Sequence, residues 1–224
     1  MSPDASAQRP PQDQWAADRE QAILDQALSR VGVLGWTRRA VHAAARAAEV
    51  SIPDADLLMP SGPRDLAALY SRRLDARMMA RLEAIDAGAL KIRERIATGV
   101  RARLEAGAEH LEATRRCAGF LSLPMHAPLG LRLAWETADL IWRWAGDRAT
   151  DENHYSKRAI LSGILIPAQT IRWFDGPEAA ERFVAARIEN VMAFEKWKAG
   201  KDFGAPLRQA AETLARVRYG ARAG

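Results

Sequence analysis

Apolar residues recur every three or four positions along most of this chain, and that spacing is the feature that most restricts its fold. On an α-helix such residues share one face, whereas a half-buried β-strand needs strict alternation. The pattern is clear at Leu24, Leu28 and Val31, and again from Leu66 to Leu82. β-Branched residues are sparse, and most Pro and Gly lie between the periodic segments. The sequence therefore predicts an all-α fold with about ten helices and no sheet.

The same segments divide the chain into four parts. Residues 1–14 are polar and Pro-rich, which predicts a disordered tail without a secretory signal. Residues 15–62 contain three short helical patterns, and residues 63–198 contain the longer helices of a body. Residues 199–224 begin with a glycine hinge and continue as an amphipathic helix. A small head, a connecting helix and a large helical body follow one another in the same order in TetR-type transcription factors.

The head, residues 15–62, resembles a helix-turn-helix unit, with Thr37 capping its second helix and Ser51 its third. The third helix would be the recognition helix, but it carries Asp54 and Asp56 and no cation. Base readout uses Arg, Lys, Asn or Gln, and carboxylates are repelled by phosphates. We therefore expect a degenerate head that binds no nucleic acid. A ligand-responsive transcriptional regulator of the TetR type is the alternative function.

The net charge, the cysteine content and the length of the apolar stretches further limit what kind of protein this can be. The formal net charge is +5 and the sequence pI is near 9.8, but many arginines stand beside acids at helical spacing, which is typical of a solvated surface. The single cysteine, Cys117, excludes an intrachain disulfide. The longest apolar stretch, residues 159–168, is about half of the ~20 residues that a spanning helix needs. Any membrane contact is therefore expected to be peripheral.

The sequence contains no recognisable catalytic motif. The four histidines form no HExxH pair, and the Glu-x-x-His spacing of di-iron helical bundles is missing. Signatures of phosphate loops, dinucleotide-binding loops and serine hydrolases are missing as well. We therefore expect no catalytic residue, no metal and no cofactor, and a protein that is not an enzyme.

A longer and more specific signal lies in the middle of the chain. Residues 145–159, with the sequence AGDRATDENHYSKRA, resemble the AGDxSTDxNxYxxRA block of the ninth coenzyme Q biosynthesis protein family. The turn at residues 123–128 and the first helix and turn from Ile23 to Thr37 are also similar to this family. The resemblance spans roughly residues 23–191 and implies a ubiquinone accessory protein with a TetR-like fold.

The resemblance implies an apolar cavity in the body that holds an isoprenoid quinone intermediate or a phospholipid. Each buried CH₂ of a polyprenyl tail is worth about 0.8 kcal/mol, so the cavity needs a long apolar lining. The residues expected to line it are Phe120, Leu121, Met125, Leu129, Leu133, Trp142, Leu161, Leu165 and Trp173. The alternative is that these side chains fill an ordinary core, in which case the protein would be a scaffold without lipid.

The resemblance also implies a protein partner, the demethoxyubiquinone hydroxylase. The residues expected to bind it are Asp151, Asn153, His154, Tyr155 and Arg158. Mitochondrial members of the family typically carry Trp where this chain has His154. An alternative role for the same residues is capping of the helix that begins here, with Arg158 paired to an acid one turn earlier.

The resemblance further implies that the last helix touches a membrane. Its arginines accompany an apolar stripe, which suits an anionic interface. The residues expected to bind the membrane are Leu207, Arg208, Leu214, Arg216, Val217 and Arg218. Docking of this helix on its own domain or on a second subunit is the alternative.

These features together predict a non-enzymatic, lipid-binding accessory protein of ubiquinone biosynthesis that presents its lipid to the hydroxylase. We expect it to be cytoplasmic and peripheral on the inner face of the cytoplasmic membrane. A homodimer is expected by analogy with TetR folds alone.

Overall fold

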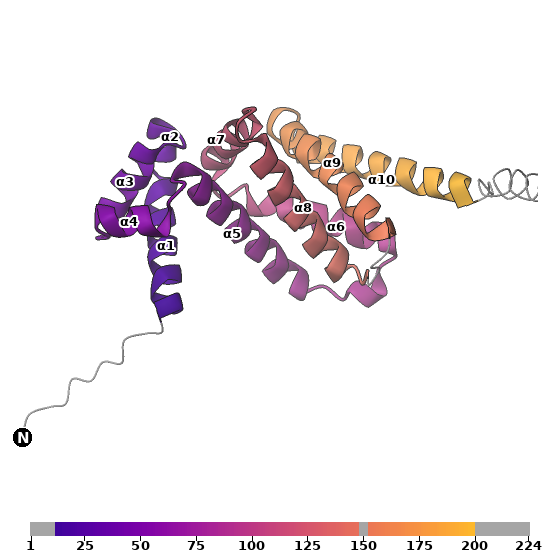
Figure 1. The fold of residues 1–224 in the computed structure, drawn as a ribbon. Coiled ribbons are helices and arrows are strands. Elements are labelled where there is room, and N and C mark those ends of the chain that lie inside the picture. Colours follow the sequence, from indigo (N-terminus) through magenta and orange to yellow (C-terminus); the bar gives the residue numbers. More distant parts are fainter. Residues whose placement is uncertain (1–11, 148–151, 200–224) are drawn as a thin grey trace, which may run out of the picture.

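The computed structural model of the protein describes residues 12–147 and 152–199 of the 224. Within these residues the fold contains ten α-helices, one short 3-10 helix at Ala87–Ala89 and no strand. This confirms the predicted all-α, TetR-like fold (Figure 1). The α-helices are α1 (Gln12–Leu28), α2 (Val31–Leu34), α3 (Arg38–Ala47), α4 (Ile52–Leu58), α5 (Pro63–Glu83), α6 (Ile92–Ala106), α7 (Leu111–Ser122), α8 (Ala127–Trp144), α9 (Glu152–Phe174) and α10 (Pro177–Ala199).

Helices α1 to α4 form a small head at one end of the molecule (Figure 1). The Thr37 hydroxyl accepts a hydrogen bond from the Ala40 amide (3.2 Å) at the start of α3. The Ser51 hydroxyl accepts one from the Asp54 amide (3.2 Å) at the start of α4. Both predicted caps are therefore confirmed. Helix α3 packs against α1 through small apolar side chains, which allow a close approach.

The second acid of α4 is bound by side chains of α3. Asp56 Oδ1 accepts a hydrogen bond from Arg38 Nη1 (2.7 Å) and lies 2.9 Å from His42 Nε2. The hydrogen bond with His42 is the main cause that lowers the pKa of Asp56, and Arg38 adds to the effect. Arg38 is thus engaged within the head, instead of being available to a phosphate group.

Helix α5 connects the head to the body. Its buried stripe follows the predicted helical spacing, and the stripe belongs to two cores. Leu66, Tyr70 and Leu74 pack with the head and with α7, whereas Met78 and Leu82 pack with the body helices. One helix therefore fixes the position of the head relative to the body.

The body is built from α6, α8, α9 and α10, and α7 lies between the body and the head, where it contacts α8 and α2 (Figure 1). Helices α6 and α8 approach closely at Gly99, where an added Cβ would lie 2.6 Å from Ile141 Cγ2. Helix α9 packs against both α8 and α10 and continues through Pro167 as one helix. These contacts place the ends of α7, α8 and α9 around a common space, which is described below.

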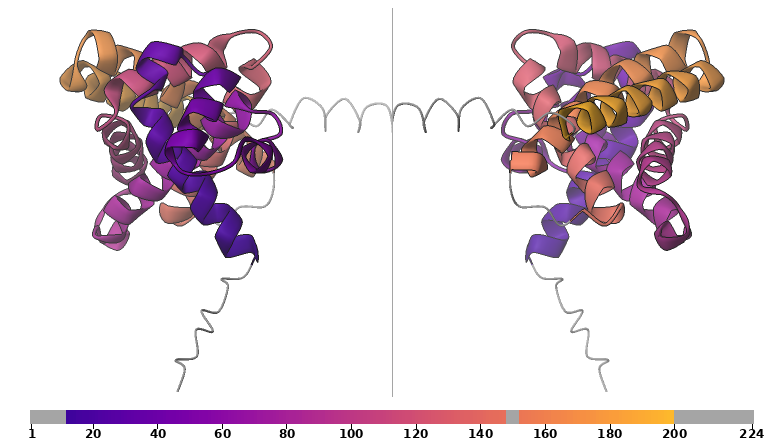
Figure 2. Two further views of the ribbon diagram at one scale, coloured as in Figure 1. Left: turned by 90° about the vertical axis from the view of Figure 1, so that its left-hand side faces the viewer. Right: turned by 90° about the vertical axis from the view of Figure 1, so that its right-hand side faces the viewer.

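Helix α10 runs out of the body at the end opposite the head (Figures 1 and 2). None of the helices in the described ranges combines the length and the apolar character needed to cross a bilayer. The amphipathic helix predicted after the glycine hinge lies outside the described residues.

Candidate functional site

A cavity of about 620 Å³ lies among α7, α8 and α9, with α5 and α6 contributing its buried side. This volume falls within the range of about 300–1,000 Å³ that is usual for small-molecule sites. Most of the lining is apolar, as in sites that bind hydrocarbon. The large apolar side chains in the lining are Leu104, Leu121, Leu131, Leu133, Leu165, Ile166, Trp173 and Phe174.

Small residues on α7 and α8 create this space. At Gly130 an added Cβ would lie 3.2 Å from the Leu121 carbonyl oxygen, so α7 and α8 nearly touch there. At Gly119, which lines the cavity, an added Cβ would meet no atom within 4 Å. Ala118, Ala127 and Ala134 also belong to the lining. The cavity therefore persists because the positions facing it carry too little volume to fill it.

Exposed apolar side chains mark the mouth of the cavity. Leu131, Ile166 and Phe174 line it and are 60%, 50% and 79% exposed. Arg115 Nη2 donates a hydrogen bond to the Trp173 carbonyl oxygen (2.6 Å), and its guanidinium lies 5.9 Å from the centre of the Phe174 ring. Arg115 thus holds the end of α9 against α7, while the apolar edge allows a ligand to enter without crossing the core.

Three polar residues lie among the less exposed residues of the lining. Ser71 of α5, Arg103 of α6 and Thr137 of α8 meet there. Arg103 Nε and Thr137 Oγ1 both donate to Asp75 Oδ1, at 2.7 and 2.8 Å, and Arg103 Nη2 donates to Ser71 Oγ at 3.3 Å. Burial raises the pKa of Asp75, although the Arg103 charge and the Thr137 hydrogen bond oppose this rise. The result is an internally paired polar cluster within a mostly apolar lining.

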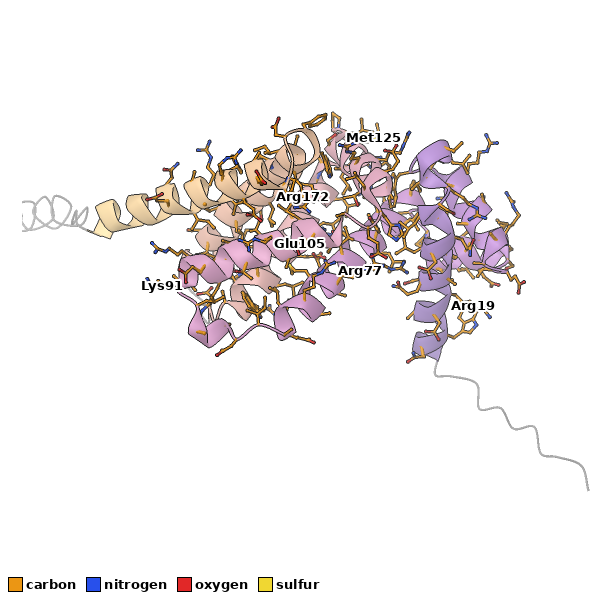
Figure 3. The ribbon with its side chains drawn as sticks, turned by 180° about the vertical axis from the view of Figure 1, so that it is seen from behind. Arg19, Arg77, Lys91, Glu105, Met125 and Arg172 are labelled. Carbon is orange, nitrogen blue, oxygen red and sulfur yellow. The ribbon has the colours of Figure 1, made fainter. Side chains whose placement is uncertain are left out.

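The structure brings together four of the nine residues that were predicted to line a lipid cavity. Leu121, Leu133, Leu165 and Trp173 line it. The other five do not. Phe120 stacks on His126 with ring centres 4.0 Å apart, Leu129 packs with Ala68 and Leu133, and Trp142 and Leu161 lie in the core of the body. Met125 is 72% exposed, at the turn between α7 and α8 on the outside of the molecule (Figure 3).

The prediction missed the polar residues of the cavity as well as its small residues. A signal for the polar ones is present in the sequence, since Ser71, Arg103 and Thr137 each stand beside or one turn from buried apolar residues of their helices. A polar side chain on the inward stripe of a helix is unusual enough to mark a candidate site.

The predicted partner-binding residues lie at the start of α9. Tyr155 is 64% exposed, and its ring centre is 6.1 Å from that of Trp135 on α8. An exposed tyrosine beside a half-buried tryptophan suits a protein interface. Asp151 lies outside the described residues, as do the side chains of Asn153 and His154.

Arg158 lies inside the protein and not on this surface. It is 1% exposed, and it donates to Asp139 Oδ1 (2.6 Å) and to Asp147 Oδ2 (2.9 Å). These two acids come from α8 and from the residues just after it. Lys157 Nζ also bonds Asp147 Oδ1 (2.7 Å), which adds a second cation to the cluster. These ion pairs fasten the start of α9 to the end of α8, beneath the exposed Tyr155.

Two further expectations concern metals and membranes. Among the described residues, no three His, Cys, Asp or Glu side chains are grouped so that they could hold a metal ion. The six residues expected to bind a membrane, from Leu207 to Arg218, lie outside the described residues.

Comparison with known proteins identifies a match to the COQ9 family over residues 127–195, which cover α8, α9 and most of α10. The chain is 27% identical over 183 residues to the mitochondrial ubiquinone biosynthesis protein COQ9 of Xenopus tropicalis, covering 77% of this chain and 57% of that protein. It is 29% identical over 180 residues to the protein of the same name in Rattus norvegicus, covering 76% of this chain and 57% of the relative. The chain therefore spans less than two thirds of the length of these relatives. The predicted family resemblance is confirmed.

Proposed function

We propose, from the premise that this chain carries a COQ9 domain and is similar to COQ9 proteins beyond it, that it is a lipid-binding accessory protein of ubiquinone biosynthesis. The observation that supports this most directly is the cavity of about 620 Å³, whose lining comes largely from α8 and α9 in the matched region. A filled core, as the scaffold alternative requires, would leave no such space.

An isoprenoid tail suits the apolar part of this cavity. Burial of one five-carbon isoprene unit is worth about 4 kcal/mol, at about 0.8 kcal/mol for each carbon group. In our proposal the tail enters between Leu131, Ile166 and Phe174, which already expose apolar surface at the mouth. The protein itself performs no chemistry on the lipid. A partner enzyme, the demethoxyubiquinone hydroxylase, modifies it.

The lipid-binding proposal can be tested by filling the cavity. The variant Gly119→Leu places a side chain into open space within the lining, and Gly163→Leu on α9 does so where no cavity is lined. Both changes remove a helical glycine, so their effects on helix propensity are similar. We expect mass spectrometry of the gently purified proteins to find isoprenoid lipid or phospholipid on the wild type and on Gly163→Leu, and at least about tenfold less on Gly119→Leu.

Equal lipid on the two variants would contradict binding at this cavity. A folded wild type that carries no lipid, and takes up none from vesicles, would contradict the function itself.

The partner contact is proposed at the exposed Tyr155 and the half-buried Trp135 beside it. Tyr155 precedes Ile166 by 11 positions and Phe174 by 19 on the same helix, which separates the patch from the mouth by about 16–28 Å at 1.5 Å for each residue. An interface of ordinary size, about 800 Å² on each partner and roughly 30 Å across, can cover both. One enzyme could therefore bind the patch and receive the lipid at the mouth.

The variant Tyr155→Ala is expected to weaken hydroxylase binding by about fivefold or more, because truncation of an aromatic side chain that anchors an interface costs about 1 kcal/mol or more. Bound lipid, which occupies a different part of the body, should not change. Binding of the hydroxylase can be measured by surface plasmon resonance, with Phe174→Ala as a second exposed aromatic variant at the mouth. Undiminished binding by Tyr155→Ala would exclude the patch.

A further inference from the structure

We propose that α8 and the neighbouring part of α5 form a cationic docking surface for an acidic partner protein, with a cleft that receives one apolar side chain of that partner. This surface adjoins Tyr155 and Trp135, so the inference rests on the proposed function, in which a partner enzyme binds there. It adds the charge of the partner's surface and the step of binding on which that charge acts.

The first argument is the order of charges from the inside of this surface to the outside. Glu136 pairs with Arg72 of α5 (3.2 Å) and with Arg132 one turn earlier on α8 (3.6 Å). Asp139 pairs with Arg143 one turn later (2.8 Å). The three arginine side chains are 58%, 61% and 69% exposed, whereas the two acidic side chains are 33% and 18% exposed. A protein that approaches α8 therefore meets guanidinium groups before it meets carboxylates.

The second argument is the charge balance of the ion pairs that are joined here. Asp139 also pairs with the buried Arg158, and Asp147 pairs with both Arg158 and Lys157. Within the described residues, this network joins five cations to three carboxylates, which leaves a net charge of +2. Carboxylates on a partner would compensate that excess, and complementary charges accelerate the encounter of two proteins.

The third argument is a cleft beside these arginines. It has a volume of about 400 Å³ and lies between α5 and α8, on the opposite side of α8 from α9 (Figure 1). Ala76 and Met79 of α5 and Leu140 of α8 form the apolar part of its lining. Glu136 and Asp139 line it as well, but their charges are compensated by arginines. An apolar side chain would fit among the three apolar residues, as the anchoring side chains of protein interfaces do.

The cationic surface is continuous with the aromatic patch. Trp135, whose ring centre lies 6.1 Å from that of Tyr155, stands next to Glu136 in the chain. Trp, Tyr and Arg are the residues most enriched at the energetic centres of protein interfaces. The segment from Arg132 to Arg143 covers about 16 Å of α8, which is well inside an interface roughly 30 Å across. One protein can therefore cover both, whereas a bilayer has no side chain to place in the cleft.

The test measures the rates of hydroxylase binding by surface plasmon resonance. The variant Arg132→Gln/Arg143→Gln removes two outer charges and leaves the aromatic patch unchanged. The matched control is Arg101→Gln/Arg116→Gln, which removes two exposed arginines of α6 and α7 that are also paired with acids. Both variants lower the net charge of the protein by two, so an effect of overall charge would be the same in each.

We expect the association rate constant of the wild type to fall at least about tenfold between roughly 0.02 and 0.5 M NaCl, because salt screens the attraction of complementary charges. For Arg132→Gln/Arg143→Gln at low salt, this constant should be at least about fivefold below wild type, with a dissociation rate within about twofold. The control should stay within about twofold of wild type in both rates. An effect confined to association distinguishes these arginines from an anchor, which acts mainly on dissociation.

The cleft is tested by filling it. Ala76→Phe places a ring in the cleft, and Ala80→Phe is its control, because Ala80 is exposed one turn later on α5 but does not line the cleft. We expect the dissociation rate to rise about fivefold or more in Ala76→Phe and to stay within about twofold of wild type in Ala80→Phe. Circular dichroism and thermal unfolding show whether each variant is folded.

The outcomes separate the inference from the function on which it rests. An association rate that does not depend on salt, or equal effects of the two arginine double variants, would overturn the cationic surface while the contact at Tyr155 stands. Equal dissociation rates of Ala76→Phe and Ala80→Phe would overturn the role of the cleft.

The arginines would face a membrane if Arg132→Gln/Arg143→Gln bound the hydroxylase as the wild type does but no longer sedimented with phosphatidylglycerol vesicles. That result would overturn the inference. A folded wild type that binds no hydroxylase at any salt concentration would contradict the proposed partner itself, and the inference would fail with it.

Discussion

Arg158 illustrates how a single side chain can stabilise a surface without belonging to it. Its guanidinium reaches Asp139 on α8 and Asp147 after α8, and the contact is shielded from solvent, with the Arg158 side chain 2% exposed. Arg143 pairs with the same Asp139 from outside, with its side chain 69% exposed. The two arginines thus share a carboxylate but differ in burial, which makes their substitution a matched pair.

The variant Arg158→Met is expected to lower the free energy of unfolding by about 3 kcal/mol, because it leaves buried carboxylates without their main cation. Arg143→Met should lower it by no more than about 0.5 kcal/mol, since exposed ion pairs contribute little. Urea unfolding followed by circular dichroism measures both values. Equal effects of the two substitutions would show that burial of the Arg158 pair has no energetic consequence.

At the scale of elements, the body depends on how closely its helices approach. Helices α6 and α8 meet at Gly99, where a methyl group would lie 2.6 Å from a side-chain carbon of the fully buried Ile141. Gly163 on α9 offers the opposite case, because a methyl group there would meet no atom within 4 Å. The same Gly→Ala substitution is therefore expected to destabilise the protein at Gly99 and to stabilise it at Gly163.

Gly99→Ala should destabilise the protein by up to about 2 kcal/mol, since an overpacking penalty of about 1–3 kcal/mol is offset by a gain in helix propensity of only about 1 kcal/mol. Gly163→Ala should stabilise it by about 0.5–1 kcal/mol, because only the propensity gain applies. Thermal unfolding of the two variants gives the comparison. A stabilised Gly99→Ala variant would mean that α6 and α8 can move apart without loss.

At the scale of the whole molecule, the head and body share packing, and the chain leaves the body at the far end. The Tyr70 hydroxyl of α5 lies 2.7 Å from Thr114 Oγ1 on α7, and the Tyr70 ring centre is 5.6 Å from that of Trp36 in the head. Helix α10 points away from this junction (Figure 1). The last described helix therefore ends on the side of the body opposite the head.

We expect a protein ending at residue 204 to lose co-sedimentation with vesicles that contain anionic lipid, because the truncation removes the arginines and apolar stripe of the proposed membrane helix. Its unfolding temperature should change little, since the described core clusters end at Ile188. A full-length variant with Arg208, Arg216 and Arg218 changed to Gln loses these charges but keeps the apolar stripe. Its co-sedimentation therefore separates the contribution of charge to membrane binding from that of apolar burial. Continued sedimentation of the truncated protein would place the membrane contact elsewhere.

The sequence by itself determined the helical architecture and the family resemblance. Helical spacing is a local property, because residues three and four apart share a face whatever the helix packs against. For that reason the stripe from Leu66 to Leu82 and the caps at Thr37 and Ser51 were predictable without any tertiary contact. The central block, residues 145–159, was specific enough to indicate the family by its order of residues alone.

Only the tertiary structure decided which inward-facing residues line the cavity and which pack entirely against other side chains. Periodicity assigns Leu161 and Leu165 to the same face of α9, and both belong to the core of the body, yet only Leu165 also lines the cavity. The bonds of Asp75 to Arg103 and Thr137 join residues 28 and 62 positions apart. Such contacts depend on where whole helices cross, and crossing points follow from the packing of many side chains at once.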